Sequence, residues 1–107
     1  MAFRVFRTDW YERKLKKLEK PEFIRVEKFE QALKEQPYSG KPLGYEWFRE
    51  KKFGGKRLMF LIYEEYKVVF LITITNKKEQ QETIDLIKSN LNTYKELIEK
   101  LLKLKPL

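Results

Sequence analysis

Basic residues between residues 40 and 63 are the ones best suited to chemistry. Trp, Phe, Leu and Ile surround them in a strand-like pattern, so the cations should project from a β-sheet. From residue 41 to residue 57, six basic residues outnumber two acidic ones, which supplies half of the net charge of +8: Lys41, Arg49, Lys51, Lys52, Lys56 and Arg57 against Glu46 and Glu50. Like charges that converge repel one another unless an anion lies between them. The stretch therefore favours a phosphate or acidic-peptide ligand.

The spacing of these cations predicts where their side chains point. Arg49 and Lys51 are two residues apart on one expected strand, so they should leave the same face. Gly54-Gly55 is a hairpin-turn signal, and Arg57 begins the returning strand, within reach of Lys51 if the hairpin is tight. We therefore expect Arg49, Lys51 and Arg57 to converge on one patch. The alternative is that the lysines near the turn are a solvated loop tip.

The rest of the composition excludes several kinds of site. The chain has no Cys and no His, which removes thiolate nucleophiles, Cys-based zinc sites and the usual general base near pH 7. No P-loop, zinc spacing, Ser/His/Asp set or dinucleotide motif is present. Paired carboxylates such as Glu64-Glu65 lie beside turns and indicate solvated surface. We expect neither a metal nor a cofactor, and any chemistry must come from Lys, Arg, Tyr or carboxylates.

Length, charge and hydropathy limit the class of protein. At 107 residues the chain has the size of one domain, and 42% hydrophobic and 15% aromatic residues suffice for a compact core. A pI near 9.6 favours polyanionic partners, because Lys and Arg that neutralise phosphates release counterions. The N-terminus has no apolar targeting segment, and no run approaches the roughly 20 apolar residues of a membrane span. We expect a cytoplasmic protein without a membrane partner.

The first 35 residues predict one strand followed by a pair of helices. Thr8 and Asp9 supply a helix N-cap, with Glu12 as a capping-box partner. Pro21 ends the first helix and suits the first position of the second. Alternation and helical spacing give the bounds of the strand and the two helices: residues 2–7, 10–20 and 22–35.

The middle of the chain predicts a loop and three strands. Two Pro, two Gly and a Ser mark residues 36–44 as the loop. The strands follow, and the last two are apolar on both faces, as central strands are: residues 45–53, 57–64 and 67–75. Lys77 and Lys78 come after the last strand and would add charge to the same pole of the sheet.

Residues 78–103 form the last predicted element, a helix. Apolar residues recur along it at steps of three and four: Ile84, Ile87, Leu91, Tyr94, Ile98 and Leu101. An unbroken helix of this length would span about 39 Å, longer than the expected sheet, although Ser89-Asn90 are poor helix formers and could bend it. The stripe either packs on the sheet or forms a seam with a partner, which would include a homodimer.

The order of these elements, together with three short segments, resembles the RelE/ParE toxin superfamily. The segments are QPYSGKPL from Gln36, WFREKKFGGKRLMFLIY from Trp47 and VVFLITIT from Val68, within a resemblance over residues 1–80. It implies one RelE-like toxin domain over residues 1–107. Its fold would be α+β, with an N-terminal strand and helical hairpin packed on a mostly antiparallel curved sheet and a long C-terminal helix. It also implies a cognate antitoxin that wraps the toxin.

RelE-type toxins cleave messenger RNA on translating ribosomes without a metal, and the resemblance implies this activity here. The ribose 2′-OH attacks the adjacent phosphate, assisted by Lys and Arg on strands and, in many members, by a C-terminal Tyr or His. Arg57 and Lys78 would stabilise charge on the transition state, and Lys51 or Arg49 would orient the phosphate. By position, the catalytic residues are Arg49, Lys51, Arg57 and Lys78. Other basic residues would bind RNA: Lys41, Lys52, Lys56 and Lys77.

Two departures from the family pattern bear on catalysis. Helix residues near Ile84 occupy the place of the family Tyr, and Lys78 replaces an Arg, which forfeits bidentate phosphate contact. Two functions therefore stay open. One is an RNA endonuclease of the mRNA interferase type. The other is a non-catalytic member, either a topoisomerase inhibitor or an RNA- or protein-binding module with a degenerate site.

If the C-terminal stripe is a homodimer seam, Leu91→Lys should convert a dimer to a monomer, because it places a charge in the middle of the apolar seam. Light scattering measures the change in mass directly. A wild-type chain that is already monomeric would rule the seam out.

Overall fold

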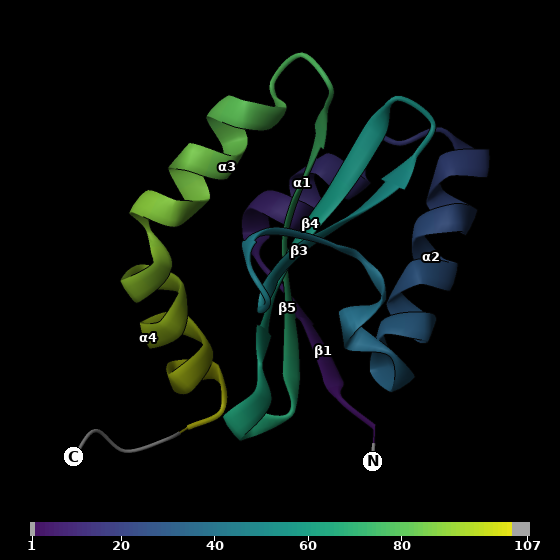
Figure 1. Ribbon diagram of the computed structural model, residues 1–107. Coiled ribbons are helices and arrows are strands. Elements are labelled where there is room, and N and C mark those ends of the chain that lie inside the picture. Colours follow the sequence, from purple (N-terminus) through teal and green to yellow (C-terminus); the bar gives the residue numbers. More distant parts are fainter. Residues whose placement is uncertain (1, 104–107) are drawn as a thin grey trace. The chain divides into compact units, whose positions relative to one another are not determined.

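A five-stranded β-sheet forms the centre of the first of two compact units. The computed structural model describes residues 2–103, and the units divide between Lys77 and Lys78. The strands are β1 (Arg4–Arg7), β2 (Lys41–Tyr45), β3 (Phe48–Phe53), β4 (Lys56–Tyr63) and β5 (Val68–Asn76). They lie in the order β1-β5-β4-β3-β2, with β1 parallel to β5 and the other neighbours antiparallel (Figure 1). The fold is α+β, as the sequence predicts.

β4 and β5 are the buried strands that the sequence predicts. Residues Arg57 to Ile62 of β4 and Val68 to Thr75 of β5 are all buried. Their β-branched and aromatic side chains suit a pleated surface that is covered on both sides. The register shifts between Met59 and Phe60, where a bulge interrupts the ladder.

β2 lies where the sequence predicts only a loop. A short 3-10 turn, η1 (Pro37–Ser39), precedes it, and β2 then pairs along the outer side of β3, with Pro42 opposite Arg49. Pro lacks a backbone N–H and is tolerated on an edge strand, because that strand needs donors on one side only. The Pro and Gly content that indicated a loop therefore marks a sheet edge.

Two helices follow β1, as predicted, but with different ends. α1 (Asp9–Leu15) begins at Thr8, whose Oγ1 accepts from the Tyr11 amide at 2.9 Å and donates to the Ile72 carbonyl at 2.6 Å. It ends five residues before the predicted boundary at residue 20. α2 (Lys20–Glu35) begins with the capping box, which joins Glu19 to Glu22 rather than Asp9 to Glu12.

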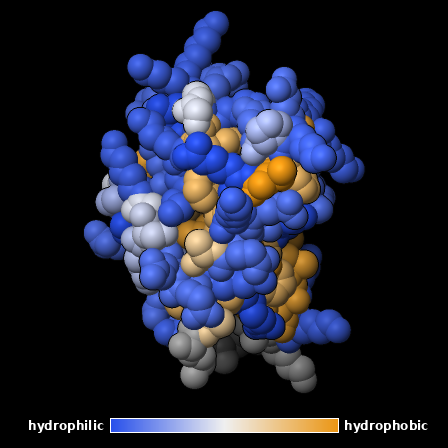
Figure 2. All heavy atoms as spheres, turned by 90° about the vertical axis from the view of Figure 1, so that its right-hand side faces the viewer, coloured by the Kyte–Doolittle hydropathy of each residue, from blue (hydrophilic) through white to orange (hydrophobic). Residues whose placement is uncertain are grey.

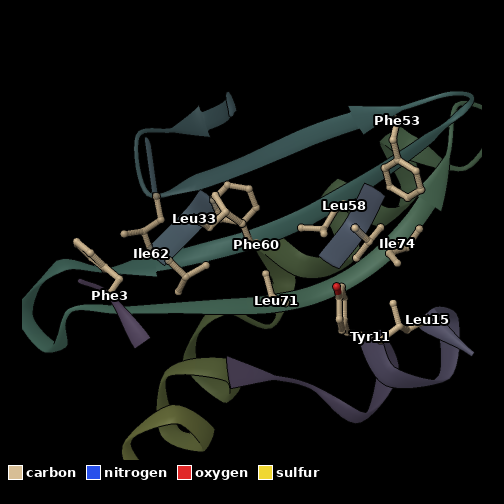
Figure 3. Close-up of a cluster of buried hydrophobic side chains, with 12 residues drawn as sticks. Phe3, Tyr11, Leu15, Leu33, Phe53, Leu58, Phe60, Ile62, Leu71 and Ile74 are labelled. Atoms are coloured by element: carbon tan, nitrogen blue, oxygen red, sulfur yellow. The ribbon is translucent and has the colours of Figure 1, made fainter. Parts of the chain in front are cut away.

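The main hydrophobic core lies between this helical pair and one face of the sheet. α1 and α2 contribute Tyr11, Leu15, Val26 and Leu33 to it. Figure 3 shows these helices' side chains beside those of the strands and of the segment before β1: Phe3, Phe53, Leu58, Phe60, Ile62, Leu71 and Ile74.

One polar group is buried at the edge of this core. The Tyr11 hydroxyl donates to Glu30 Oε2 at 2.6 Å, and Arg7 Nη2 donates to Glu30 Oε1 at 2.8 Å. Burial, followed by the hydrogen bond to Glu30, raises the pKa of Tyr11 well above its ordinary value. The carboxylate of Glu30 is thus held by two donors from two different elements, which ties α2 to β1 and α1.

The second unit contains α3 (Gln80–Ser89) and α4 (Leu91–Leu101). The segment is helical, as predicted, but it is not one unbroken helix. Asn90 leaves helical geometry with φ −122° and ψ 21°. The Asn90 side chain donates to the Leu86 backbone carbonyl at 2.8 Å, and the Ser89 hydroxyl donates to the Asp85 backbone carbonyl at 2.8 Å. Side chains that compete for backbone groups in this way favour a helix break. The homodimer seam stays a prediction.

Between residues 2 and 103, no helix combines the length and the apolar character that crossing a membrane requires.

Tyr11→Phe should destabilise the protein by about 2 kcal/mol, because a buried carboxylate loses a charge-assisted hydrogen bond. The free energy of urea unfolding measures this loss. Tyr38→Phe is the matched control, since the Tyr38 hydroxyl donates at 2.8 Å to the exposed Glu64, and its cost should stay below about 0.5 kcal/mol. Equal effects of the two substitutions would contradict this role of the buried carboxylate.

Candidate nucleic-acid interface

The turn between β3 and β4 decides which cations share a face of the sheet. Gly54 has φ +58°, the left-handed conformation that a tight two-residue hairpin turn uses. The resulting register pairs Lys52 with Arg57 and Lys51 with Leu58. Paired residues project to one face, and successive residues project to opposite faces. Lys51 and Arg57 therefore lie on opposite faces, and the predicted convergence of these two side chains is wrong.

Arg57 projects from the sheet face that points away from α1 and α2. Leu58, next to it, packs into the core beneath those helices, so Arg57 must point the other way. Its cross-strand neighbours are Lys52 on β3 and Thr75 on β5. The Arg57 guanidinium donates from Nη1 to the Gly55 carbonyl at 3.3 Å, while its buried Nε has no hydrogen-bond partner within residues 2–103. A buried donor without an acceptor is costly, and an anion would relieve that cost.

Arg49 holds the segment before β3 against the strand. Its Nε donates to the Gly40 carbonyl at 3.0 Å, and its Nη1 donates to the Glu46 carbonyl at 3.1 Å and carboxylate at 3.0 Å. The guanidinium also lies 5.7 Å from the centroid of the Tyr38 ring. The side chain is 90% buried. These contacts give Arg49 a structural role, and its catalytic role stays a prediction.

Gly40 lets the chain approach β3 closely. A Cβ atom at this position would lie 2.5 Å from the Glu50 carbonyl oxygen, closer than real Cβ contacts allow. The close approach brings Ser39 to Lys51, whose Nζ donates to the Ser39 hydroxyl at 3.1 Å. The same Nζ lies 5.2 Å from the centroid of the Phe29 ring on α2. Lys51 is therefore on the helix side of the sheet, beside Arg49.

Lys56, a predicted RNA contact, has a carboxylate partner. Its Nζ lies 3.0 Å from Oε1 of Glu22 at the start of α2. The hydrogen bond from Lys56 is the main reason that the pKa of Glu22 falls below its ordinary value. The pair joins the hairpin to α2, so much of the positive charge of Lys56 is already balanced.

The remaining predicted RNA contacts are exposed. Lys41 opens β2, on the outer edge of the sheet. Lys77 follows β5 at the end of the sheet where the β3–β4 turn lies, because Asn76 of β5 pairs with Lys56. Lys78 is exposed and opens the second unit, and its catalytic role stays a prediction.

A shallow pocket on the first unit gathers several of these basic residues. It has a volume of about 300 Å³ and lies between α2, η1 and β3, with these lining residues: Arg25, Phe29, Ser39, Gly40, Lys41, Glu50, Lys51 and Lys52. Sequence reasoning missed Arg25, Phe29 and Ser39. The spacing of Arg25 and Phe29 by four residues on a helix was a usable signal, because such residues share one helix face.

Solved structures of RelE toxins share this architecture. A RelBE2 toxin–antitoxin complex from Mycobacterium tuberculosis is 26% identical, with coverage of 72% of this chain and 100% of that chain and a TM-score of 0.63. The chain belongs to the RelE/ParE toxin superfamily. A mutant of the E. coli toxin RelE in the free state is 20% identical, covering 78% of this chain and 90% of that one, with a TM-score of 0.67. The archaeal RelE–RelB complex from Pyrococcus horikoshii is 19% identical, covering 72% of this chain and 97% of that chain, with a TM-score of 0.63.

The assignment rests on structure rather than on sequence search. Neither a protein-family model nor a curated protein matches this RelE-like chain. The solved toxins cover about three quarters of the chain.

Arg49→Ala should destabilise the RelE-like fold by about 2–3 kcal/mol, because it removes a buried cation and leaves two carbonyl groups without their donor. Lys52→Ala is the control, because Lys52 is exposed on the same strand as Arg49. It should change the free energy of unfolding by less than about 0.5 kcal/mol. Chemical denaturation of the two variants makes the comparison. A small effect of Arg49→Ala would show that the side chain is free for ligand binding.

Proposed function

We propose that the chain is the toxin of a toxin–antitoxin pair and cleaves messenger RNA on translating ribosomes without a metal. The supporting observation is Arg57, a buried guanidinium whose Nε has no acceptor within residues 2–103. Lys52 lies directly opposite it, and Thr75 flanks it on β5. Two adjacent cations, one of them with an unsatisfied donor, suit a phosphate group.

The proposed reaction needs no cofactor, because RNA supplies its own nucleophile. The ribose 2′-oxygen gives its proton to solvent water and forms a bond to the adjacent phosphorus, and the bond from phosphorus to the 5′-oxygen breaks. The products are a 2′,3′-cyclic phosphate and a 5′-hydroxyl group, which receives a proton. Arg57 would stabilise the negative charge that builds up on the phosphate oxygens. Lys52 would hold the phosphate in place as a point charge.

A cognate antitoxin is part of the same proposal. Solved neighbours in this fold include the RelBE2 complex of M. tuberculosis and the RelE–RelB complex of P. horikoshii, both of them toxin–antitoxin complexes. A short reading frame beside the gene would be its candidate source. Co-expression of that frame should restore growth if the chain is a toxin.

Induced expression of the chain, followed by primer extension on cellular messages, tests the nuclease. We expect cuts within codons, and a loss of about 100-fold or more in cutting for Arg57→Ala, the typical effect of removing a donor to a developing oxyanion. Arg57→Lys should cut little more than Arg57→Ala, because lysine lacks the forked donors of the guanidinium group. Arg13→Ala, an exposed arginine of α1, is the matched control and should cut like the wild type.

Other outcomes separate the alternatives. Growth arrest with intact messages would contradict the nuclease and favour a topoisomerase inhibitor. Unimpaired growth would favour a binding module with a degenerate site. Equal cutting by Arg57→Ala and the wild type would remove Arg57 from the reaction.

A further inference from the structure

Basic side chains near the β3–β4 hairpin fall into two classes. Arg49 and Lys56 have carboxylate partners at 3.0 Å. The four basic residues that line the 300 Å³ pocket have no ion pair with any residue from 2 to 103: Arg25, Lys41, Lys51 and Lys52. Glu50 is the single acid among the lining residues. The pocket is thus lined by four basic residues whose charge no ion pair in the described part of the chain balances.

The pocket's donors are held in place by contacts within the protein. The Arg25 guanidinium lies 6.0 Å and the Lys51 ammonium 5.2 Å from the centroid of the Phe29 ring. Because the Ser39 hydroxyl accepts from Lys51, its own proton remains available for donation into the pocket. A guanidinium, an ammonium and a hydroxyl group can together satisfy a tetrahedral phosphate, which accepts hydrogen bonds in several directions.

Lys52 is the residue that connects the pocket with Arg57. β2 pairs with β3 no further than Glu50, so no strand within residues 2–103 covers the outer edge of β3 beyond that residue. Lys52 sits at this uncovered edge, lines the pocket and pairs with Arg57. Figure 2 views the molecule from the side on which α2 lies, where hydrophilic residues predominate. Lys52 therefore offers a polyanion bound in the pocket a further contact directly beside Arg57.

We propose that the pocket between α2, η1 and β3 binds a backbone phosphate of single-stranded RNA, next to the phosphate held at Arg57. This inference deepens the proposed function and rests on it for the identity of the polymer. The connection through Lys52 favours a polymer over a free phosphate, because only a polymer occupies both sites at once. The pocket would hold the strand and take no part in the chemical step.

Binding of a fluorescent single-stranded RNA by the full chain, measured by anisotropy at several salt concentrations, tests the pocket. An Arg57→Ala background prevents cleavage during the measurement. In that background, Arg25→Ala should weaken binding on the order of tenfold, as expected for one charge-assisted hydrogen bond. It should also reduce the slope of log affinity against log salt by about 0.7, the value for one phosphate of a single strand. Lys51→Ala should act in the same direction.

Lys28→Ala is the matched control, because Lys28 is exposed on the same helix, carries the same charge and does not line the pocket. It should leave affinity within about twofold. Equal losses in Arg25→Ala and Lys28→Ala would overturn the proposal in favour of a diffuse basic surface. Undetectable RNA binding in the Arg57→Ala background would also overturn it.

Two other probes separate the possible ligands. If Arg25→Ala weakens binding of a polyglutamate peptide but not of RNA, the pocket is a protein contact and the proposal fails. If it weakens binding of inorganic phosphate alone, the site takes a free anion and the proposal fails. RNA binding that depends on Arg25 in a chain that leaves messages intact would uphold the pocket and reject the nuclease, so the two failures are distinguishable.

Discussion

The two-residue turn at Gly54-Gly55 fixes the register of β3 on β4, and the placement of the basic residues depends on that register. It opposes Lys52 to Arg57, sends both toward the face away from α1 and α2, and leaves Lys51 on the helix side. A slip of β4 by one residue would exchange its side chains between the two faces of the sheet. Leu58 would leave the core and Arg57 would enter it. The core therefore enforces the same register that places the candidate phosphate-binding groups.

Local pattern was sufficient for much of the fold. The β-branched run in β5 and the apolar run in β4 are each buried over most of their length, as strands that are apolar on both faces should be. β2 was missed because Pro42 in an edge strand has the same local signature as Pro in a loop. The break at Asn90 depends on side-chain hydrogen bonds to the preceding turn, which compete closely with helix propagation.

The sequence predicts which residue types form the candidate site, but it does not predict how their side chains are arranged. Clustered cations indicated an anion ligand, and alternation correctly placed Arg49 and Lys51 on one face. The sequence does not predict the contact partners of these two side chains. Arg49 contacts Gly40 and Glu46, and Lys51 contacts Ser39 and Phe29. These contacts depend on the close approach of η1 to β3. Whether a basic residue is balanced by an acid depends on tertiary neighbours such as Glu22 beside Lys56. Spacing along the chain does not predict these tertiary neighbours.

The parallel pairing of β1 with β5 has a consequence for how the protein is made. Arg4 pairs with Val68, and the cap residue Thr8 donates to the Ile72 carbonyl, 64 residues along the chain. Contacts this distant in sequence are slow to form, because a long loop must close first. During synthesis, the N-terminal strand has no partner until β5 has emerged from the ribosome. A protein proposed to cleave messenger RNA during translation therefore stays incompletely folded through most of its own synthesis.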